Sequence, residues 1–379
     1  MNDIPEKPSD LSANPRTGPV RYDFIDAMRG LAALAVLYLH MADILLRYGN
    51  VKSALEVLIF KATSQFLDVG KIGVIIFFAI SGFVIPLSLK KRENTVSKFL
   101  INRFFRLYPA YWLSVGLALY VLYYLQSIPV PVGIAVVNLT MLQQFFGLPN
   151  IIDAYWTLQI ELVFYATCLI LFLCGVLDRV DRVFLVSAIF LLIAVLFALL
   201  RFATHHKVPV ALPLGLSIMF WGSLMQTWRM EFSDDAKRYA NLLAIALILL
   251  MPLISVLAYN FDAGFEESWY RYTASYYAAI GLFYLLTGRF RLSVKFLSWL
   301  GTISYSIYLF HPIFITITMD YVYSIYPSLA VSHLYILIAA GLTIAFSSCV
   351  YVWVEAPCIK LGRALNNYRT TRLTALSQT

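Results

Sequence analysis

The chain has 379 residues, of which 60% are hydrophobic and only 13% are charged, and its mean hydropathy is +0.75. A soluble globular domain is usually about 45–50% apolar and about 25% charged, so this composition excludes a soluble protein and predicts an integral membrane protein. The formal net charge of +8 would suit a nucleic-acid partner, but the placement of the basic residues argues against one.

Ten hydrophobic stretches are long enough to cross a bilayer, which takes about 20 apolar residues in a helix. The sequence therefore predicts an all-α, polytopic bundle of about ten transmembrane helices. With a cytoplasmic amino terminus, 22 of the 29 Lys and Arg residues fall inside and 7 outside, which predicts both termini cytoplasmic. The predicted spans are 24–46, 68–89, 107–126, 155–177, 183–201, 210–228, 239–259, 271–288, 296–318 and 333–355.

The predicted organisation is one transmembrane domain, 21–363, between a polar tail, 1–20, and a carboxyl-terminal tail, 364–379, both cytoplasmic. The uncharged segment 131–147 is nearly long enough to cross the membrane as well. Prolines flank it and polar residues interrupt it, so we expect it to be interfacial or re-entrant. A true span there would reverse every later loop and remove the charge asymmetry.

The first span contains two residues that are costly in hydrocarbon, Arg29 and His40. They are eleven positions apart, so in a helix they lie on one face with a rise of about 16 Å between them. Ionisable residues in a membrane helix are interpreted first as functional. The spacing predicts two points along one path through the membrane, with Arg29 nearer the cytoplasm.

Two further ionisable residues are predicted at the depth of His40. Glu161 in the fourth span, His311 in the ninth span and His40 each lie roughly 9–10 Å from the outer end of their helix. We expect them to stabilise one another. An imidazole can take a proton from a hydroxyl, and a carboxylate can orient the ring and stabilise its charge. The alternative is that these groups only join helices or relay protons.

Polar side chains also recur at helical spacing within these two spans. The stripes are Thr157, Glu161 and Tyr165 in the fourth span, and Ser304, Tyr308 and His311 in the ninth. The hydroxyls of Tyr165 and Ser304, together with that of Ser81 in the second span, are candidates for a functional role. The alternative for these hydroxyls is interhelical hydrogen bonding.

The cytoplasmic loop before the third span carries Arg103 and Arg106, three positions apart in an aromatic turn that ends at a proline. Paired guanidinium groups suit phosphate oxygens, although basic residues here also anchor the positive-inside topology. In the second span, Ser81 and Gly82 let helix backbones approach closely. The functional alternative at that position is a constriction that a slender substrate arm passes.

Taken together, these segments resemble the acyltransferase-3 family of membrane acyltransferases. The matching segments are, in order, Asp26-AMRGLAALAVLYLH, Phe77-FAISGF, Asn102-RFFRLYPAY, Trp156-TLQIELVFY, Leu300-GTISYSIYLFH and Glu355-AP. The resemblance implies an enzyme of the bacterial inner or plasma membrane that takes an acyl group from cytoplasmic acyl-CoA, with acetyl-CoA as the default donor. The group goes to a carbohydrate hydroxyl, usually at the extracytoplasmic side. The expected partners are this donor, a glycan acceptor and membrane lipids, without nucleic acid or a metal.

The resemblance also implies roles for individual residues. His40 corresponds to the family's catalytic residue and shares its motif with Arg29, while Arg103 and Arg106 correspond to arginines that hold coenzyme A. Further family motifs fall on Glu161, Tyr165, Ser304, Tyr305 and His311.

The expected mechanism has His40 as general base toward the acceptor hydroxyl, oriented by Glu161, with direct acyl transfer favoured over an acyl-enzyme. Tyr165, Ser304 and Ser81 are the candidate donors to the thioester oxyanion. A proton-coupled transporter or flippase for a carbohydrate or small molecule fits the composition and the buried histidines equally well. The arginine pair and the ordered motifs favour the acyltransferase. A scaffold protein would leave three buried ionisable groups unexplained.

Overall fold

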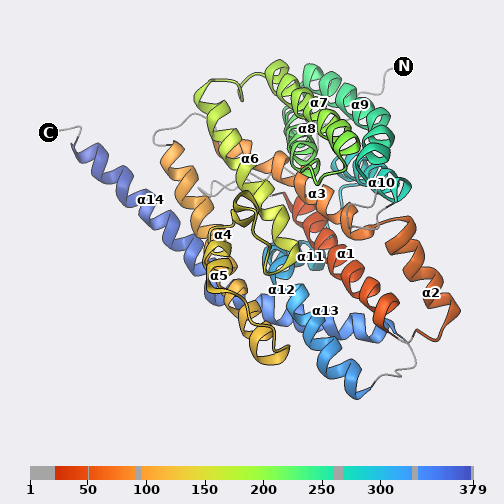
Figure 1. The fold of residues 1–379 in the computed structure, drawn as a ribbon. Coiled ribbons are helices and arrows are strands. Elements are labelled where there is room, and N and C mark those ends of the chain that lie inside the picture. The colour runs from red at the N-terminus through yellow and green to blue at the C-terminus, as the bar shows by residue number, and fades with distance from the viewer. Residues whose placement is uncertain (1–21, 50, 90–94, 260–267, 327–331, 377–379) are drawn as a thin grey trace.

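The computed structural model describes residues 22–49, 51–89, 95–259, 268–326 and 332–376, and within these ranges the chain is helical without strands (Figure 1). The helices are α1 (Asp23–Tyr48), α2 (Ala54–Lys61), α3 (Val69–Val84), α4 (Thr95–Tyr120), α5 (Val132–Asn138), α6 (Trp156–Leu173), α7 (Val180–Thr204), α8 (Ala211–Glu231), α9 (Asp234–Tyr259), α10 (Trp269–Thr287), α11 (Lys295–Thr302), α12 (Ser304–Ile317), α13 (His333–Val350) and α14 (Ala356–Leu376).

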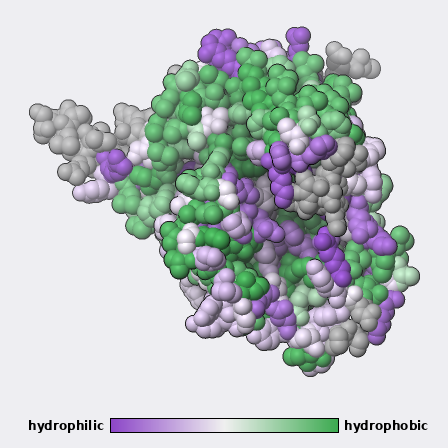
Figure 2. Space-filling model, viewed as in Figure 1, coloured by the Kyte–Doolittle hydropathy of each residue, from purple (hydrophilic) through white to green (hydrophobic). Residues whose placement is uncertain are grey.

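Seven of the described helices are long and apolar enough to cross a membrane, and the bent pair α11 and α12 is an eighth if it forms one span. Figure 2 shows hydrophobic side chains over the outer surface of α7 and α9, and hydrophilic side chains in the hollowed centre. Each predicted span coincides with a helix, or with two at 296–318, so the all-α polytopic bundle is confirmed. The number of ten spans stays a prediction, because α8 and α10 are not among the seven.

The helix α8 shows why an inner helix can be less apolar than one that faces lipid. It packs against α3, α7 and α9, and every residue from Pro213 to Gln226 is buried by protein. Such a helix does not face lipid, so it tolerates polar side chains such as Ser217 and Gln226, which are buried. The hydropathy of α8 can therefore be low, because neighbouring helices and not lipid surround it.

Close helix crossings build the centre of the bundle. A Cβ atom at Gly82 of α3 would lie 1.6 Å from the carbonyl oxygen of Met219 of α8, and one at Gly222 would lie 2.1 Å from that of Ala79. The backbones of α3 and α8 are therefore nearly in contact, as small residues allow in membrane helices. The predicted close approach at Gly82 is confirmed.

The predicted ninth span is broken into two helices. The axes of α11 and α12 differ by 75°, and the break lies at Ile303. Gly301 packs so tightly on the first turn of α1 that a Cβ there would lie 1.8 Å from the carbonyl oxygen of Asp26. This contact holds α11 against α1 and lets α12 start inside the bundle at Ser304.

Between residues 95 and 150 one sequence expectation is corrected, and the expectation that segment 131–147 does not span the membrane agrees with the structure. The turn expected to end at Pro109 is absent, since α4 runs through this proline from Thr95 to Tyr120. Helices in a membrane tolerate an internal proline when neighbours satisfy the freed backbone groups. The segment 131–147 contains only the seven-residue α5, about 10 Å long, and a 3-10 turn, so no spanning helix forms there.

Candidate active site

Two predicted site residues, His40 and His311, meet where α1 packs against α12. Nε2 of His311 lies 3.1 Å from Nδ1 of His40, and the ring centroids are 5.0 Å apart. His311 has no exposed surface, whereas the His40 side chain is accessible. The structure thus brings these two residues together from the first and ninth predicted spans.

Backbone carbonyls indicate which ring nitrogen of each histidine carries hydrogen. Nδ1 of His311 lies 2.8 Å from the carbonyl oxygen of Tyr308, so it is the donor, and Nε2 of a neutral His311 is an acceptor. Nδ1 of His40 lies 3.0 Å from the carbonyl oxygen of Val36, and its hydrogen is shared with Nε2 of His311. Nε2 of His40 then carries a lone pair that can accept a proton.

A cavity of about 80 Å³ lies between α1, α3, α4, α6 and α12, and it is large enough for several water molecules. Five of the predicted site residues line it: Arg29, Ser81, Arg106, Glu161 and Ser304. Its other walls are Val74, Phe77, Phe78, Leu107, Thr157, Leu158, Tyr305 and Tyr308. The cavity therefore joins two guanidinium groups, a carboxylate and several hydroxyls with an apolar wall.

Glu161 is held at this cavity by two hydroxyls. The Tyr165 hydroxyl donates to Oε1 of Glu161 at 2.5 Å, and the Ser81 hydroxyl lies 3.5 Å from the same oxygen. Arg29 lines the same cavity, and its Nη1 lies 3.6 Å from Oδ1 of Asp26 one turn back on α1. Glu161 is thus surrounded by hydroxyl donors and cations.

The expected pairing of Glu161 with His40 is not present, because the two residues lie at different levels. The Thr157 hydroxyl, in the first turn of α6, donates to the Tyr308 hydroxyl at 2.7 Å. From this point Glu161 lies one turn along α6 and His311 lies one turn along α12. Since the two helices run in opposite directions, Glu161 and His311 are separated by about 10 Å along the bundle.

The predicted depth of Glu161 is wrong because it takes residue 155, the start of the fourth predicted span, as the outer end of the helix. In the structure the preceding 3-10 turn, Asp153–Tyr155, already buries Ala154 and Tyr155. Tyr155 is buried, and its hydroxyl lies 2.8 Å from that of Ser114 on α4. The helix α6 therefore starts deeper than hydropathy suggests, which moves Glu161 toward the half predicted to be cytoplasmic.

Arg103 and Arg106 project from α4 into neighbouring but different surroundings. Arg106 is exposed and lines the cavity. Arg103 donates to the Ser88 hydroxyl at 3.2 Å, and its guanidinium carbon lies 5.2 Å from the ring centroid of Tyr165. Among the described residues, Nε of Arg103 is buried without a hydrogen-bond partner. Both arginines are placed where an anion arriving from the side predicted to be cytoplasmic would meet them.

Two aromatic rings separate the cavity from the histidine pair. Phe77 of α3 meets Tyr308 of α12 edge to face, with centroids 6.0 Å apart, and both line the cavity. The ring of Tyr308 lies 5.7 Å from that of His311. Tyr308 therefore contacts both Phe77 and His311 and links the wall of the cavity to the histidine pair. The constriction expected in the second span stays a prediction.

The sequence analysis assigned no role to Glu355, which the structure buries near this site. It lies at the end of a π-helical turn, Tyr351–Glu355, and accepts a hydrogen bond from Ser306 of α12. The preceding residue of α12, Tyr305, donates to the carbonyl oxygen of Leu107 at 2.9 Å. A carboxylate at the end of an apolar run was the available signal, and its contacts here join α12 to its neighbours.

Several hydroxyls considered for oxyanion binding already have acceptors. Tyr165 donates to Glu161, and Ser304 donates to the carbonyl oxygen of Gly301 at 2.8 Å. Ser81, with its long contact to Glu161, is the least committed of the three. Within the described ranges, no group of three or more His, Cys, Asp or Glu side chains is placed to hold a metal ion.

A membrane helical bundle with a polar inner cavity and an accessible imidazole defines the class, and comparison with known proteins gives the family. The model of the acyltransferase domain family, acyltransferase-3, matches residues 22–352. The chain therefore belongs to the acyltransferase-3 family, and the family resemblance found in the sequence is confirmed.

Two curated proteins are similar to parts of the chain. Acyltransferase MdmB of Streptomyces mycarofaciens is 28% identical over 156 residues, which cover 39% of this chain and 38% of MdmB. Protein 2 in the picA locus of Rhizobium radiobacter is 32% identical over 120 residues, covering 30% of this chain and 53% of that protein. The matches thus span less than two thirds of either relative. No solved structure matches the chain.

Proposed function

We propose that this protein is a membrane O-acyltransferase that moves an acyl group, with acetyl as the default, from cytoplasmic acyl-CoA to a hydroxyl of a carbohydrate at the extracytoplasmic side. We place it in a bacterial inner or plasma membrane. The observation that carries the proposal is the alignment of three features in a chain of this family: the exposed Arg106, the inner cavity and the histidine pair.

The spacing of these features suits the donor. From Tyr165, which Arg103 contacts, to Thr157 is eight residues of α6, and from Tyr308 to His311 is three residues of α12. The corresponding helical rises sum to about 16 Å. The pantetheine arm has about a dozen bonds between its diphosphate and its sulfur, which span about 15 Å when extended. A donor whose phosphates bind at the arginines therefore carries its thioester to the histidine pair.

The anion end of the donor suits Arg103 and Arg106 because guanidinium groups bind phosphate oxygens with several hydrogen bonds. Arg103 has a buried nitrogen for which the described residues provide no acceptor. Arg29 lies further along the same path and lines the cavity that the arm would cross. The apolar wall formed by Val74 and Leu158 suits the methylene groups of the arm.

In the proposed reaction, Nε2 of His40 takes the proton of the acceptor hydroxyl while that oxygen forms a bond to the thioester carbonyl carbon. The carbon–sulfur bond breaks, and coenzyme A leaves as a thiolate that receives the proton. His311 accepts a hydrogen bond from Nδ1 of His40 and so orients the ring. In this mechanism Glu161 lines the proposed donor cavity and does not orient His40.

The proposal is tested by mass spectrometry of surface glycans from cells that carry the wild type, the His40→Ala variant or no gene. We expect an acyl-ester mass in the wild type only. His206→Ala is the matched control, because His206 is exposed beyond the end of α7 and should leave the ester mass unchanged. An ester mass retained at equal membrane abundance of His40→Ala would contradict the assignment of the base.

A further inference from the structure

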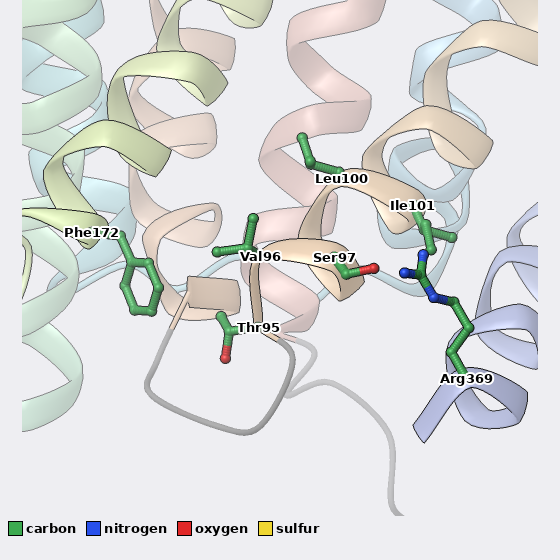
Figure 3. A pocket seen from close by; sticks show the side chains of 7 residues that line it. All are labelled: Thr95, Val96, Ser97, Leu100, Ile101, Phe172 and Arg369. Atoms are coloured by element: carbon green, nitrogen blue, oxygen red, sulfur yellow. The ribbon is translucent and has the colours of Figure 1, made fainter. Parts of the chain in front are cut away.

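A second and larger cavity opens where the amino-terminal end of α4 meets the carboxyl-terminal ends of α6 and α14. Its volume is about 660 Å³, within the usual range for ligand pockets of about 300–1,000 Å³. It is lined by Thr95, Val96, Ser97, Leu100, Ile101, Phe172 and Arg369. Figure 3 shows the Phe172 ring on one side and the Arg369 guanidinium on the other, with the Ser97 hydroxyl pointing toward Arg369.

The position of Arg369 is fixed by the packing of α14 on α4. Nδ2 of Asn366, one turn before Arg369, donates to Oδ1 of Asn102 at 2.9 Å. Further back on α14, a Cβ at Gly362 would lie 3.0 Å from Cβ of Phe105. These contacts direct the last described turns of α14 along α4 and bring the guanidinium to the cavity.

This cavity continues the line of the donor site toward the side predicted to be cytoplasmic. Phe172 lies seven residues after Tyr165 on α6, and Val96 lies seven residues before Arg103 on α4. Seven residues are two helical turns, so each pair shares a helix face with a rise of about 10 Å. Phe99, between the two levels, meets the Tyr165 ring at 5.9 Å. The larger cavity therefore lies about two helical turns from Arg103, toward the side predicted to be cytoplasmic.

The chemistry of its walls suits a nucleotide. Arginine binds phosphate through paired donors, and an aromatic ring provides a face on which a base stacks. Arg369 and the Ser97 hydroxyl form the polar side, and Phe172 with Val96 forms the apolar side. A lone phosphate would leave the apolar side unused, and an acyl chain would leave the guanidinium unused.

We infer that this cavity binds the nucleotide end of the donor, with the adenine beside Phe172 and the 3′-phosphate at Arg369. The inference rests on the proposed function, because it assumes that the donor is a coenzyme A thioester whose diphosphate lies at Arg103 and Arg106. It extends that function by assigning a binding site, outside the inner cavity, to the nucleotide part of the donor.

The test compares three donors with purified enzyme: acetyl-CoA, acetyl-dephospho-CoA, which lacks only the 3′-phosphate, and acetyl-pantetheine, which lacks the nucleotide. In the Arg369→Ala variant we expect KM for acetyl-CoA to rise roughly ten- to hundred-fold, as for loss of a charge-assisted phosphate contact. KM for the other two donors should stay unchanged. In Phe172→Ala, KM should rise for both nucleotide donors but not for acetyl-pantetheine.

Arg363→Ala is the matched control, because Arg363 is an exposed arginine of the same helix that does not line the cavity. An unchanged KM for acetyl-CoA in Arg369→Ala, or an equal rise for all three donors, would overturn the inference. Acyl transfer by the wild type from none of the three donors would instead refute the proposed function. Thermal stability of each variant in detergent separates loss of fold from loss of binding.

Discussion

The histidine pair allows one prediction to be worked out from the structure. Replacing His311 by Leu removes the acceptor 3.1 Å from Nδ1 of His40 and leaves only the carbonyl oxygen of Val36 at 3.0 Å. The lost hydrogen bond matters most when His40 carries the acceptor's proton, and bonds to charged groups contribute about 1.5–3 kcal/mol. At 1.36 kcal/mol per factor of ten, kcat should fall roughly 10- to 150-fold.

His311→Gln is the conservative variant, since its amide oxygen can reach the position of Nε2 and accept the same hydrogen bond. We expect it to recover most of the lost kcat. The assay follows coenzyme A release from acetyl-CoA with a cell-surface glycan fraction as the acceptor. KM for acetyl-CoA should not change in either variant, because His311 does not line the donor cavity. The reasoning is refuted if His311→Leu keeps the wild-type kcat, or if it changes only KM.

Two further predictions concern the stability of the fold. Gly222→Ala should destabilise the protein by about 1–3 kcal/mol or more, because the new Cβ overlaps a carbonyl oxygen of α3, whereas Gly116→Ala, with open space around it, should not; thermal inactivation in detergent compares them. Burial alone would raise the pKa of the Glu56 carboxyl. Hydrogen bonds from Ser332 and from His333, whose Nδ1 lies 2.8 Å from Oε1 of Glu56, outweigh burial and lower this pKa. The stability that Glu56 contributes is thus present above its ordinary pKa of 4.5 and is lost as pH falls through the lowered pKa. The Glu56→Gln variant should therefore lose this part of the acid sensitivity of the melting temperature. A melting temperature that falls with acid as in the wild type would contradict the linkage.

Hydropathy and charge placement predicted most of the fold, because a bilayer forces each spanning segment to be a long apolar helix. They also predicted that Arg29 and His40 share a face of α1. The structure supports this, since Arg29 lines the cavity and His40 contacts His311. Helical periodicity sufficed here, because both residues lie on one unbroken helix.

Relations between helices were predicted less well, because sequence does not show how deep a helix starts. The predicted depth of Glu161 takes residue 155 as the outer end of the fourth span, yet the half-buried Trp156 packs on the buried Phe78 with centroids 6.3 Å apart. The break at Ile303 depends on the packing of Gly301 against Asp26, a contact between segments 275 residues apart. Neither the depth at which α6 starts nor the break at Ile303 has a local sequence signal. The expected pairing of Glu161 with His40 depended on the depth of α6, and it is therefore wrong.

The separation of Glu161 from His40 has a consequence for the proposed chemistry. A general base must be neutral when it meets its substrate, and a carboxylate beside an imidazole favours the charged ring. The structure gives His40 a neutral imidazole partner and places Glu161 with Arg29 and Arg106 instead. The Glu161 carboxylate balances part of the positive charge of the two arginines. The charge balance of the cavity therefore does not depend on a bound phosphate. In the proposed mechanism, donor binding and proton abstraction therefore use separate sets of charges, on either side of Tyr308.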